Sequence, residues 1–147
     1  MRSNTDAVLT YVQLLARHFR KDDINAAIVI ILYDLGLPSD MEGFLYLRAA
    51  IALYHTKTAT SMVKGIYPVI AQDHYDNHSW QYIDQAIRRV IQSAWDAREG
   101  DAWELFFPPS TFKKSKCPPN KVFIARISCI IELWQSCKEV DYERLIH

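Results

Sequence analysis

The sequence predicts an all-α protein of six to seven helices around a single core. Apolar residues recur at the three- and four-residue spacing of amphipathic helices along most of the 147 residues. No segment shows the strict alternation of apolar and polar residues that indicates a half-buried strand. Half of the residues are hydrophobic, so the chain is long enough for one buried core but short for two.

The first two helices are expected before Pro38. Residues 6–19 place their apolar side chains on one helical face. A second helix follows a cap at Asp22 or Asp23 and ends at Gly36, a residue that suits a left-handed C-terminal cap. Pro38 then prevents the helix from continuing.

A third helix is expected to run to about His55. Either Ser39 or Asp40 supplies its N-terminal cap, and Glu42 stands three residues after Ser39, the spacing of a capping box.

The fourth helix is expected to open at Thr58 or Thr60 and to continue through Ala71. Pro68 lies inside its apolar pattern, so either this helix kinks or two short helices meet there.

The fifth helix follows a polar turn at residues 73–78 and runs from near Ser79 to about Arg98. Its inner arc is apolar: Ile83, Ile87, Val90, Ile91 and Ala94. Its outer arc mixes hydrogen-bond donors and acceptors: Gln81, Tyr82, Asp84, Gln85, Arg88, Arg89 and Gln92. In the major groove arginine can bind guanine, glutamine adenine and aspartate cytosine. An ordinary solvated face stays open as an alternative, because glutamine and arginine are also good helix formers.

A short amphipathic turn at residues 101–107 leads into a proline-bounded basic loop, and a final helix begins near Pro119. Residues 138–147 either extend that helix or form a frayed tail.

The charges are segregated although the formal net charge is zero. Residues 44–72 and 106–131 contain lysines and arginines but no acid. Such a distribution suits a protein with one face toward phosphate, although chance clustering on solvated faces is equally compatible with it. If one face meets DNA, the side chains expected to contact its phosphates are Lys64, Ser79, Lys113, Lys114 and Lys116.

Enzymatic, metal-dependent and membrane functions are not indicated. No nucleophile elbow, phosphate-binding glycine loop or HExxH motif occurs, and no cofactor is expected. His74 and His78 have ligand spacing but flank a predicted turn without further ligands, so no metal site is expected. The three cysteines fit neither a zinc site nor a disulfide framework, and Cys117 is expected to be an inert loop thiol rather than an oxidisable one. The N-terminal residues show neither the unbroken apolar region nor the cleavage site typical of a signal peptide, and no apolar stretch reaches bilayer length, so the cytoplasm and no membrane contact are expected.

Four segments resemble the C-terminal response-regulator effector domain of the sporulation master regulator, stage-zero sporulation protein A. They are GLPSDMEGFLYLRAAIALYH, SMVKGIYPVIA, QAIRRVIQSAW and LFFPPSTFKKSKCPPNKVFIARI. The resemblance implies a compact helical bundle, a helix-turn-helix and transcription control by binding short promoter boxes, often as tandem dimers. It predicts an N-terminal helical extension at residues 1–22, a DNA-binding domain at residues 23–137 and a tail or helix extension at residues 138–147.

The resemblance also assigns the elements that read DNA. Residues 64–71 belong to the scaffold helix, and residues 81–95 form the recognition helix. Among the family's polar reading residues only Arg88 is unchanged; Asp84 replaces a glutamate and Gln85 an arginine, which shifts preference from guanine toward adenine. The turn between the two helices is about two residues longer than in the family.

Double-stranded DNA is therefore the expected partner. Two copies of the chain can form a homodimer on that DNA. The base-reading side chains are expected to be Gln81, Tyr82, Asp84, Gln85, Arg88 and Arg89. The alternative is a protein-interaction module that has lost DNA reading and binds RNA polymerase or titrates a related regulator. Such a module would use Trp95, Trp103, Leu105 and Phe106, where the resemblance suggests a contact with a sigma factor of RNA polymerase. The segment before Asp23 is expected to pack on the bundle rather than to act as a dimerisation helix.

We expect the substitution Lys114→Ala to weaken binding to all duplexes similarly and to make the salt dependence shallower by about one unit. The measurement is affinity for specific and random duplexes across a salt series. An unchanged slope would exclude Lys114 as a phosphate contact.

Overall fold

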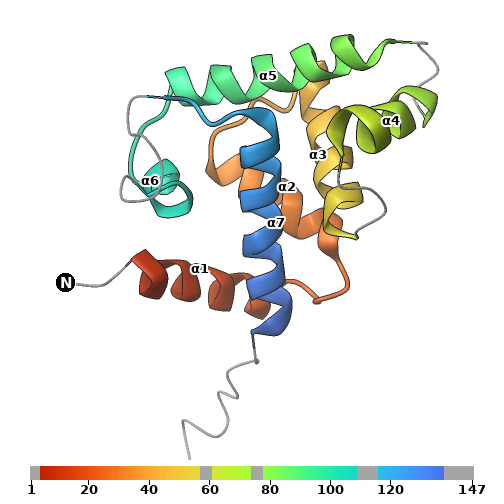
Figure 1. The fold of residues 1–147 in the computed structure, drawn as a ribbon. Coiled ribbons are helices and arrows are strands. Elements are labelled where there is room, and N and C mark those ends of the chain that lie inside the picture. Colours follow the sequence, from red (N-terminus) through yellow and green to blue (C-terminus); the bar gives the residue numbers. More distant parts are fainter. Residues whose placement is uncertain (1–3, 57–60, 74–77, 109–115, 138–147) are drawn as a thin grey trace, which may run out of the picture.

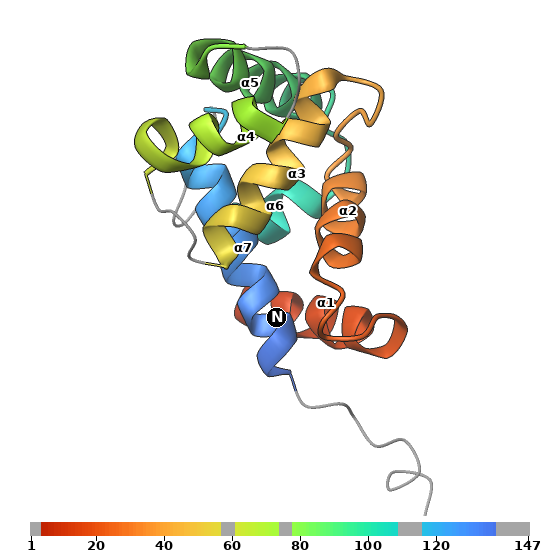
Figure 2. The same ribbon diagram turned by 90° about the vertical axis from the view of Figure 1, so that its right-hand side faces the viewer.

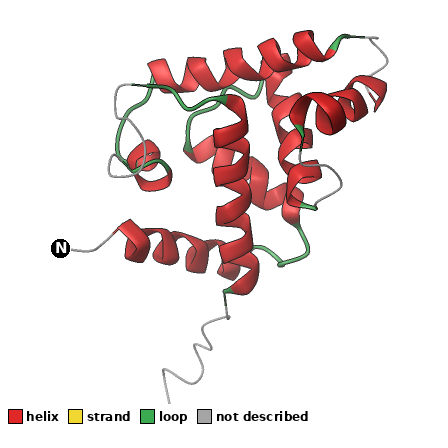
Figure 3. Cartoon of the chain, in the orientation of Figure 1, coloured by secondary structure: helices red, strands yellow, loops and turns green. Residues whose placement is uncertain are grey.

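The computed structural model describes residues 4–56, 61–73, 78–108 and 116–137, and these form helices joined by loops without a strand (Figure 3). The elements are α1 (Asn4–His18), α2 (Ile24–Asp34), α3 (Glu42–His55), the π-helix η1 (Met62–Ile66), α4 (Tyr67–Asp73), α5 (Trp80–Asp96), α6 (Ala102–Phe106) and α7 (Asn120–Ser136). The all-α prediction is confirmed. Among the described residues, no helix has both the length and the apolar character needed to cross a bilayer.

Helices α3 and α7 form the centre of the bundle, and the remaining helices cover them. In Figures 1 and 2, α5 lies across one end of the molecule and α1 lies at the opposite end, with α7 running between them. Helix α3 packs against both α5 and α7, while α1 packs against α7 and α6. The segment before Asp23 therefore forms part of the bundle, with Val8, Val12 and Leu15 buried.

A single core is built from large side chains on most of the helices. The largest fully buried ones include Tyr46 of α3, Tyr67 of α4, Phe123 and Trp134 of α7. The indole of Trp103 is also buried and donates a hydrogen bond of 2.9 Å to the carbonyl oxygen of Leu35. This bond ties α6 to the end of α2 and satisfies a polar group that burial would otherwise penalise.

Several helix ends follow the capping rules from which they were predicted. The carboxylate of Asp23 accepts a 3.1 Å hydrogen bond from the amide of Ala26 at the start of α2. Gly36, just beyond α2, has a φ of 80°, the left-handed conformation that favours glycine at this position.

The predicted cap of α3 is wrong. Neither Ser39 nor Asp40 caps this helix; its N-cap residue is Met41, which makes no side-chain cap bond. The carboxylate of Glu42, expected to close a capping box, instead accepts hydrogen bonds from the hydroxyls of Tyr46 and Tyr82. A tertiary contact with two tyrosines has replaced the local one.

The fourth predicted helix is two elements, one of the two arrangements that the position of Pro68 left open. Thr58 and Thr60 lie outside the described residues, and Ser61 caps η1 by accepting a 3.2 Å bond from the amide of Lys64. The π-helix passes directly into α4, where Pro68 is the second residue. A proline ring clashes with the carbonyl four residues earlier in a regular helix, and the wider π turn relieves that clash.

Helices α3 and α5 approach each other closely at Gly43. A Cβ atom at this residue would lie 2.0 Å from the carbonyl oxygen of Ala86 and 2.6 Å from its carbonyl carbon. Because both atoms belong to the backbone, a side chain at position 43 would push α5 away from α3.

We expect Gly43→Ala to lower the free energy of unfolding by about 1 to 3 kcal/mol, the usual range for overpacking. In an open helix this change would stabilise by about 1 kcal/mol, so the backbone clash decides the sign. Thermal or denaturant unfolding measures the effect, and Leu45→Ala, at an exposed position on the same helix, is the control. A stabilised Gly43→Ala protein would contradict the close approach.

Candidate nucleic-acid interface

Helices α4 and α5 pack together as the two arms of a helix-turn-helix, with α5 along the outer edge of the molecule (Figure 1). Residues 74–77, which connect them, lie outside the described part of the chain. The hydroxyl of Ser79 caps α5 by accepting a 3.3 Å bond from the amide of Tyr82. The longer α5 is thus attached to the bundle along its length, with one face outward.

The inner face of α5 is apolar and buried, as predicted. Its buried residues are Ile83, Ala86, Ile87, Val90, Ile91 and Ala94. On the opposite side Gln81, Gln85 and Arg89 are exposed at intervals of four residues, so they follow one ridge along the helix. Within the described part of the chain, no hydrogen bond or ion pair engages these three side chains. We call this row the outer ridge.

One flank of α5 is held by the first turn of α3. The hydroxyl of Tyr82 donates to the carboxylate of Glu42, which also accepts from Tyr46. The imidazole of His78 stacks on the Tyr82 ring, with 3.7 Å between ring centroids, and its Nε2 lies 3.8 Å from the Glu42 carboxylate. Tyr82 is 39 % exposed, yet these contacts fix the orientation of its ring without a ligand.

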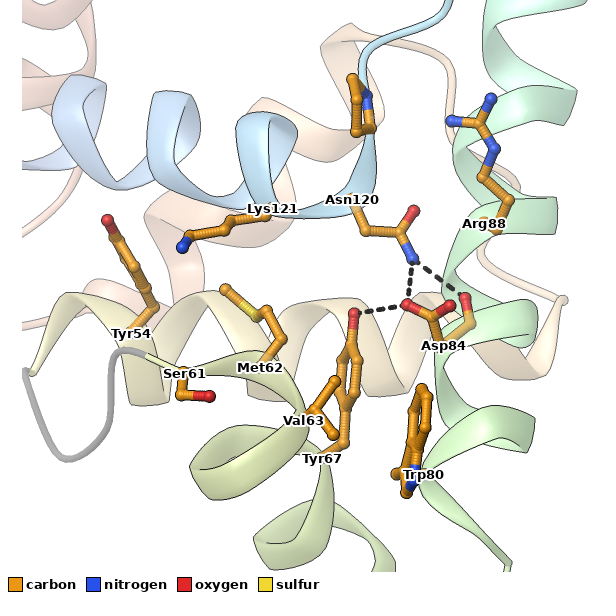
Figure 4. Close-up of a pocket in the computed structure, with 11 residues that line it drawn as sticks. Tyr54, Ser61, Met62, Val63, Tyr67, Trp80, Asp84, Arg88, Asn120 and Lys121 are labelled. Carbon is orange, nitrogen blue, oxygen red and sulfur yellow. Dashed lines mark hydrogen bonds between the residues drawn. The ribbon is translucent and has the colours of Figure 1, made fainter.

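The opposite flank of α5 is held by α4 and by the start of α7 (Figure 4). The carboxylate of Asp84 accepts a 2.9 Å bond from the hydroxyl of Tyr67 and a 3.1 Å bond from the side-chain amide of Asn120. Asn120 also donates to the Asp84 carbonyl oxygen at 2.9 Å. Burial, reinforced by the adjacent Asp84 carboxylate, raises the pKa of Tyr67 well above its ordinary value, so its hydroxyl keeps donating throughout the neutral range.

Arg88, one turn after Asp84, is also engaged within the molecule. Its Nη1 donates to the carbonyl oxygen of Pro118 at 2.9 Å, and its Nη2 donates to Gln92 at 3.1 Å. Gln92 in turn donates to Asp96 at 2.8 Å. Asp84 and Arg88 thus turn toward the segment before α7, whereas Gln81, Gln85 and Arg89 face solvent.

The predicted phosphate contacts are only partly described. Lys64 in η1 and Lys116 before α7 are exposed, and Ser79 is exposed at the start of α5. Lys113 and Lys114 lie outside the described residues. The hydroxyl of Ser79 already serves as a cap acceptor, which leaves its own proton as a donor toward an anion.

A groove of about 780 Å³ lies between η1, the first half of α5 and the start of α7 (Figure 4). One side of the groove is apolar and is lined by Met62, Val63 and Trp80. The other side is polar and is lined by Lys121, Asp84 and Asn120. No group of three potential metal ligands occurs among the described residues. His74 is not described, and His78 is positioned by its stacking on Tyr82.

The family of the chain is established by comparison with known proteins. Residues 28–131, more than half of the chain, match the family described as Sporulation initiation factor Spo0A C terminal. The chain belongs to this family. Spo0A C-terminal domains are DNA-binding domains of a sporulation regulator and are not an enzyme family.

The sigma-factor contact suggested by the resemblance to the Spo0A C-terminal family needs correction at two of its four residues. Trp103 is 3 % exposed and Phe106 is 0 % exposed, so neither side chain is available to another protein. Leu105 and Trp95 are partly buried, and the guanidinium of Arg98 lies 3.8 Å from the Trp95 ring centroid. Only this edge of the predicted contact reaches the surface.

Sequence reasoning missed Glu42, Tyr67 and Asn120 as residues that hold α5. Tyr67 and Asn120 belong to otherwise apolar helical patterns, and Glu42 was assigned to a local cap. None of the three has a sequence signal for its role, since each contacts α5 from a different element of the fold.

Cys117 is less acidic than an ordinary thiol. Burial raises its pKa, and the neighbouring Arg88 guanidinium, 3.6 Å from the sulfur, opposes this only in part. Its thiolate fraction at neutral pH is therefore small, which agrees with the expectation of an inert thiol.

We expect iodoacetamide at pH 7.5 to alkylate the exposed Cys129 before the half-buried Cys117, because thiolate is the reactive form. Mass spectrometry of peptides from a time course measures the two rates. The variant Cys129→Ser serves as the control for peptide assignment. Faster alkylation of Cys117 would contradict a raised pKa at that residue.

Proposed function

We propose that the chain is a sequence-specific regulator that binds double-stranded DNA and reads the major groove with α5. The observation that carries the proposal is the outer ridge of Gln81, Gln85 and Arg89, which is exposed and unengaged on a helix whose opposite face is buried. Membership of the Spo0A C-terminal family supports DNA as the partner.

The dimensions of the outer ridge suit a short DNA site. Eight residues separate Gln81 from Arg89, which corresponds to about 12 Å along a helix. At about 3.4 Å per base pair this distance spans three to four pairs. Glutamine can bond the N6 and N7 atoms of adenine, and arginine the O6 and N7 atoms of guanine. The ridge therefore favours a site in which adenines precede a guanine on one strand or its complement.

Tyr82 is the fourth base-edge residue of the proposal. The bond to Glu42 fixes its ring at the side of the outer ridge, where the ring face and edge can contact a thymine methyl group. Lys64, Ser79, Lys113, Lys114 and Lys116 would neutralise phosphates and set the register.

We propose two further partners, a second copy of the chain and a sigma factor of RNA polymerase. Short promoter boxes in tandem imply a homodimer on DNA, which would place one α5 in each box. The exposed edge of Trp95 and Leu105 is the proposed position for a sigma factor of RNA polymerase.

Selection of bound duplexes from a random pool at about 150 mM salt tests the proposed function. The expected result is one enriched motif whose binding weakens steeply as salt increases. Weak binding without an enriched motif would overturn the proposal and favour the protein-interaction module.

We expect Gln85→Ala to cost about 1 to 3 kcal/mol on the enriched site and to relax preference at one base pair. Competition against duplexes changed one pair at a time measures this. Gln13→Ala, an exposed glutamine of α1 at the opposite end of the molecule, is the matched control and should bind as the unmodified protein does. An equal loss on every duplex would remove Gln85 from the reading surface.

A further inference from the structure

We propose that Arg88 and Asp84 are positioning residues for DNA recognition, which hold residues 117–120 against α5 and do not read bases themselves. This inference rests on the proposed function, because it assigns how the recognition helix acts. It reverses the role that the sequence predicts for both residues, and for Arg88 in particular.

Asp84 stands at a junction of three elements. Tyr67 reaches it from α4 and Asn120 from α7, and both donate to the same carboxylate oxygen, Oδ1. The second bond from Asn120, to the Asp84 carbonyl oxygen, means that α7 grips both the side chain and the backbone of this residue. The junction therefore fixes the angle between the scaffold helix and the recognition helix.

Arg88 extends the same attachment by one helical turn. In Figure 4 its guanidinium points along α5 away from Asp84, where Nη1 donates to the carbonyl oxygen of Pro118. Gln92 occupies Nη2, and Asp96 fixes Gln92. Hydrogen bonds to Pro118, Cys117 and Gln92 hold the two terminal guanidinium nitrogens, and turning the guanidinium out to grip guanine with two donors would break them.

Lys116 directly precedes the segment that Arg88 holds. This lysine is exposed and precedes Cys117 and Pro118, which Arg88 contacts in this segment. Holding Pro118 beside α5 therefore keeps the backbone at Lys116, two residues earlier, near that helix. When that helix enters the groove, Lys116 is in place for a phosphate on the adjoining strand. Arg88 thus acts on DNA through Lys116.

Arg88→Ala separates positioning from base reading. We expect it to weaken binding about tenfold on every duplex, to leave the preferred base pair at each position unchanged and to make the salt dependence shallower by about one unit, as loss of one phosphate contact does. A loss of preference confined to one base pair would overturn the proposal.

A double-mutant cycle with Lys116→Ala tests the route from Arg88 to DNA. If Arg88 acts through Lys116, the double variant binds about as well as Arg88→Ala alone, because the two changes remove one contact. Losses that multiply would show independent action and would overturn this route. Arg88→Lys keeps a donor for the Pro118 carbonyl but cannot bond guanine in the same bidentate way; we expect it to bind more tightly than Arg88→Ala with the original base preference.

Tyr67→Phe and Asn120→Ala test the Asp84 junction without changing an exposed residue of α5. Each should reduce affinity uniformly across duplexes while circular dichroism shows a folded protein, and a changed preference at one base pair would count against positioning. Should Arg88→Ala unfold, Arg88→Lys and Tyr67→Phe carry the same test.

The controls separate this proposal from the proposed function. If the unmodified protein enriches no motif, the proposed function fails. If it enriches a motif and both Gln85→Ala and Arg88→Ala change base preference, only the positioning role fails.

Discussion

The close approach of α3 and α5 at Gly43 and Ala86 is the constraint on which the position of α5 and its outer ridge depends. Without a side chain at position 43, the two backbones meet and α5 settles deep enough to bury its apolar face. The same approach brings the neighbouring Glu42 within reach of Tyr82. A larger residue at position 43 would separate the helices and disturb both the buried face of α5 and the contact of Glu42 with Tyr82. Core packing and the orientation of the outer ridge therefore depend on the same residue.

Gly43 sets the distance between α3 and α5. Hydrogen bonds then attach α5 along both of its flanks. Glu42 holds one flank through Tyr82, and Tyr67 and Asn120 hold the other through Asp84. Restricting a helix from two sides leaves its outer ridge as the part free to meet a ligand. It also reduces the entropy that the helix would lose on binding, because the orientation is fixed beforehand.

The sequence predicts the fold well because local rules determine it. Helical periodicity identified the buried face of α5, and Asp23, Gly36 and Ser79 marked helix ends by chemistry that acts within a few residues. The same periodicity defines an outward arc without showing which of its members another segment covers. Gln85 and Arg88 look equivalent on such an arc, yet only Arg88 lies beside Pro118. Tertiary contacts from distant positions decide that difference.

The hydrogen bonds of the acids beside α5 make the proposed DNA-binding face compatible with a net charge of zero. Glu42 and Asp84 lie at the two flanks of α5, and both accept hydrogen bonds from neutral hydroxyl or amide donors. Neutral partners stabilise a carboxylate without consuming a cation. In the described part of the chain, no ion pair occupies Arg89 or Lys64, so both cations stay available to DNA. What matters for binding is therefore the partner of each acid on this face rather than the total charge of the protein.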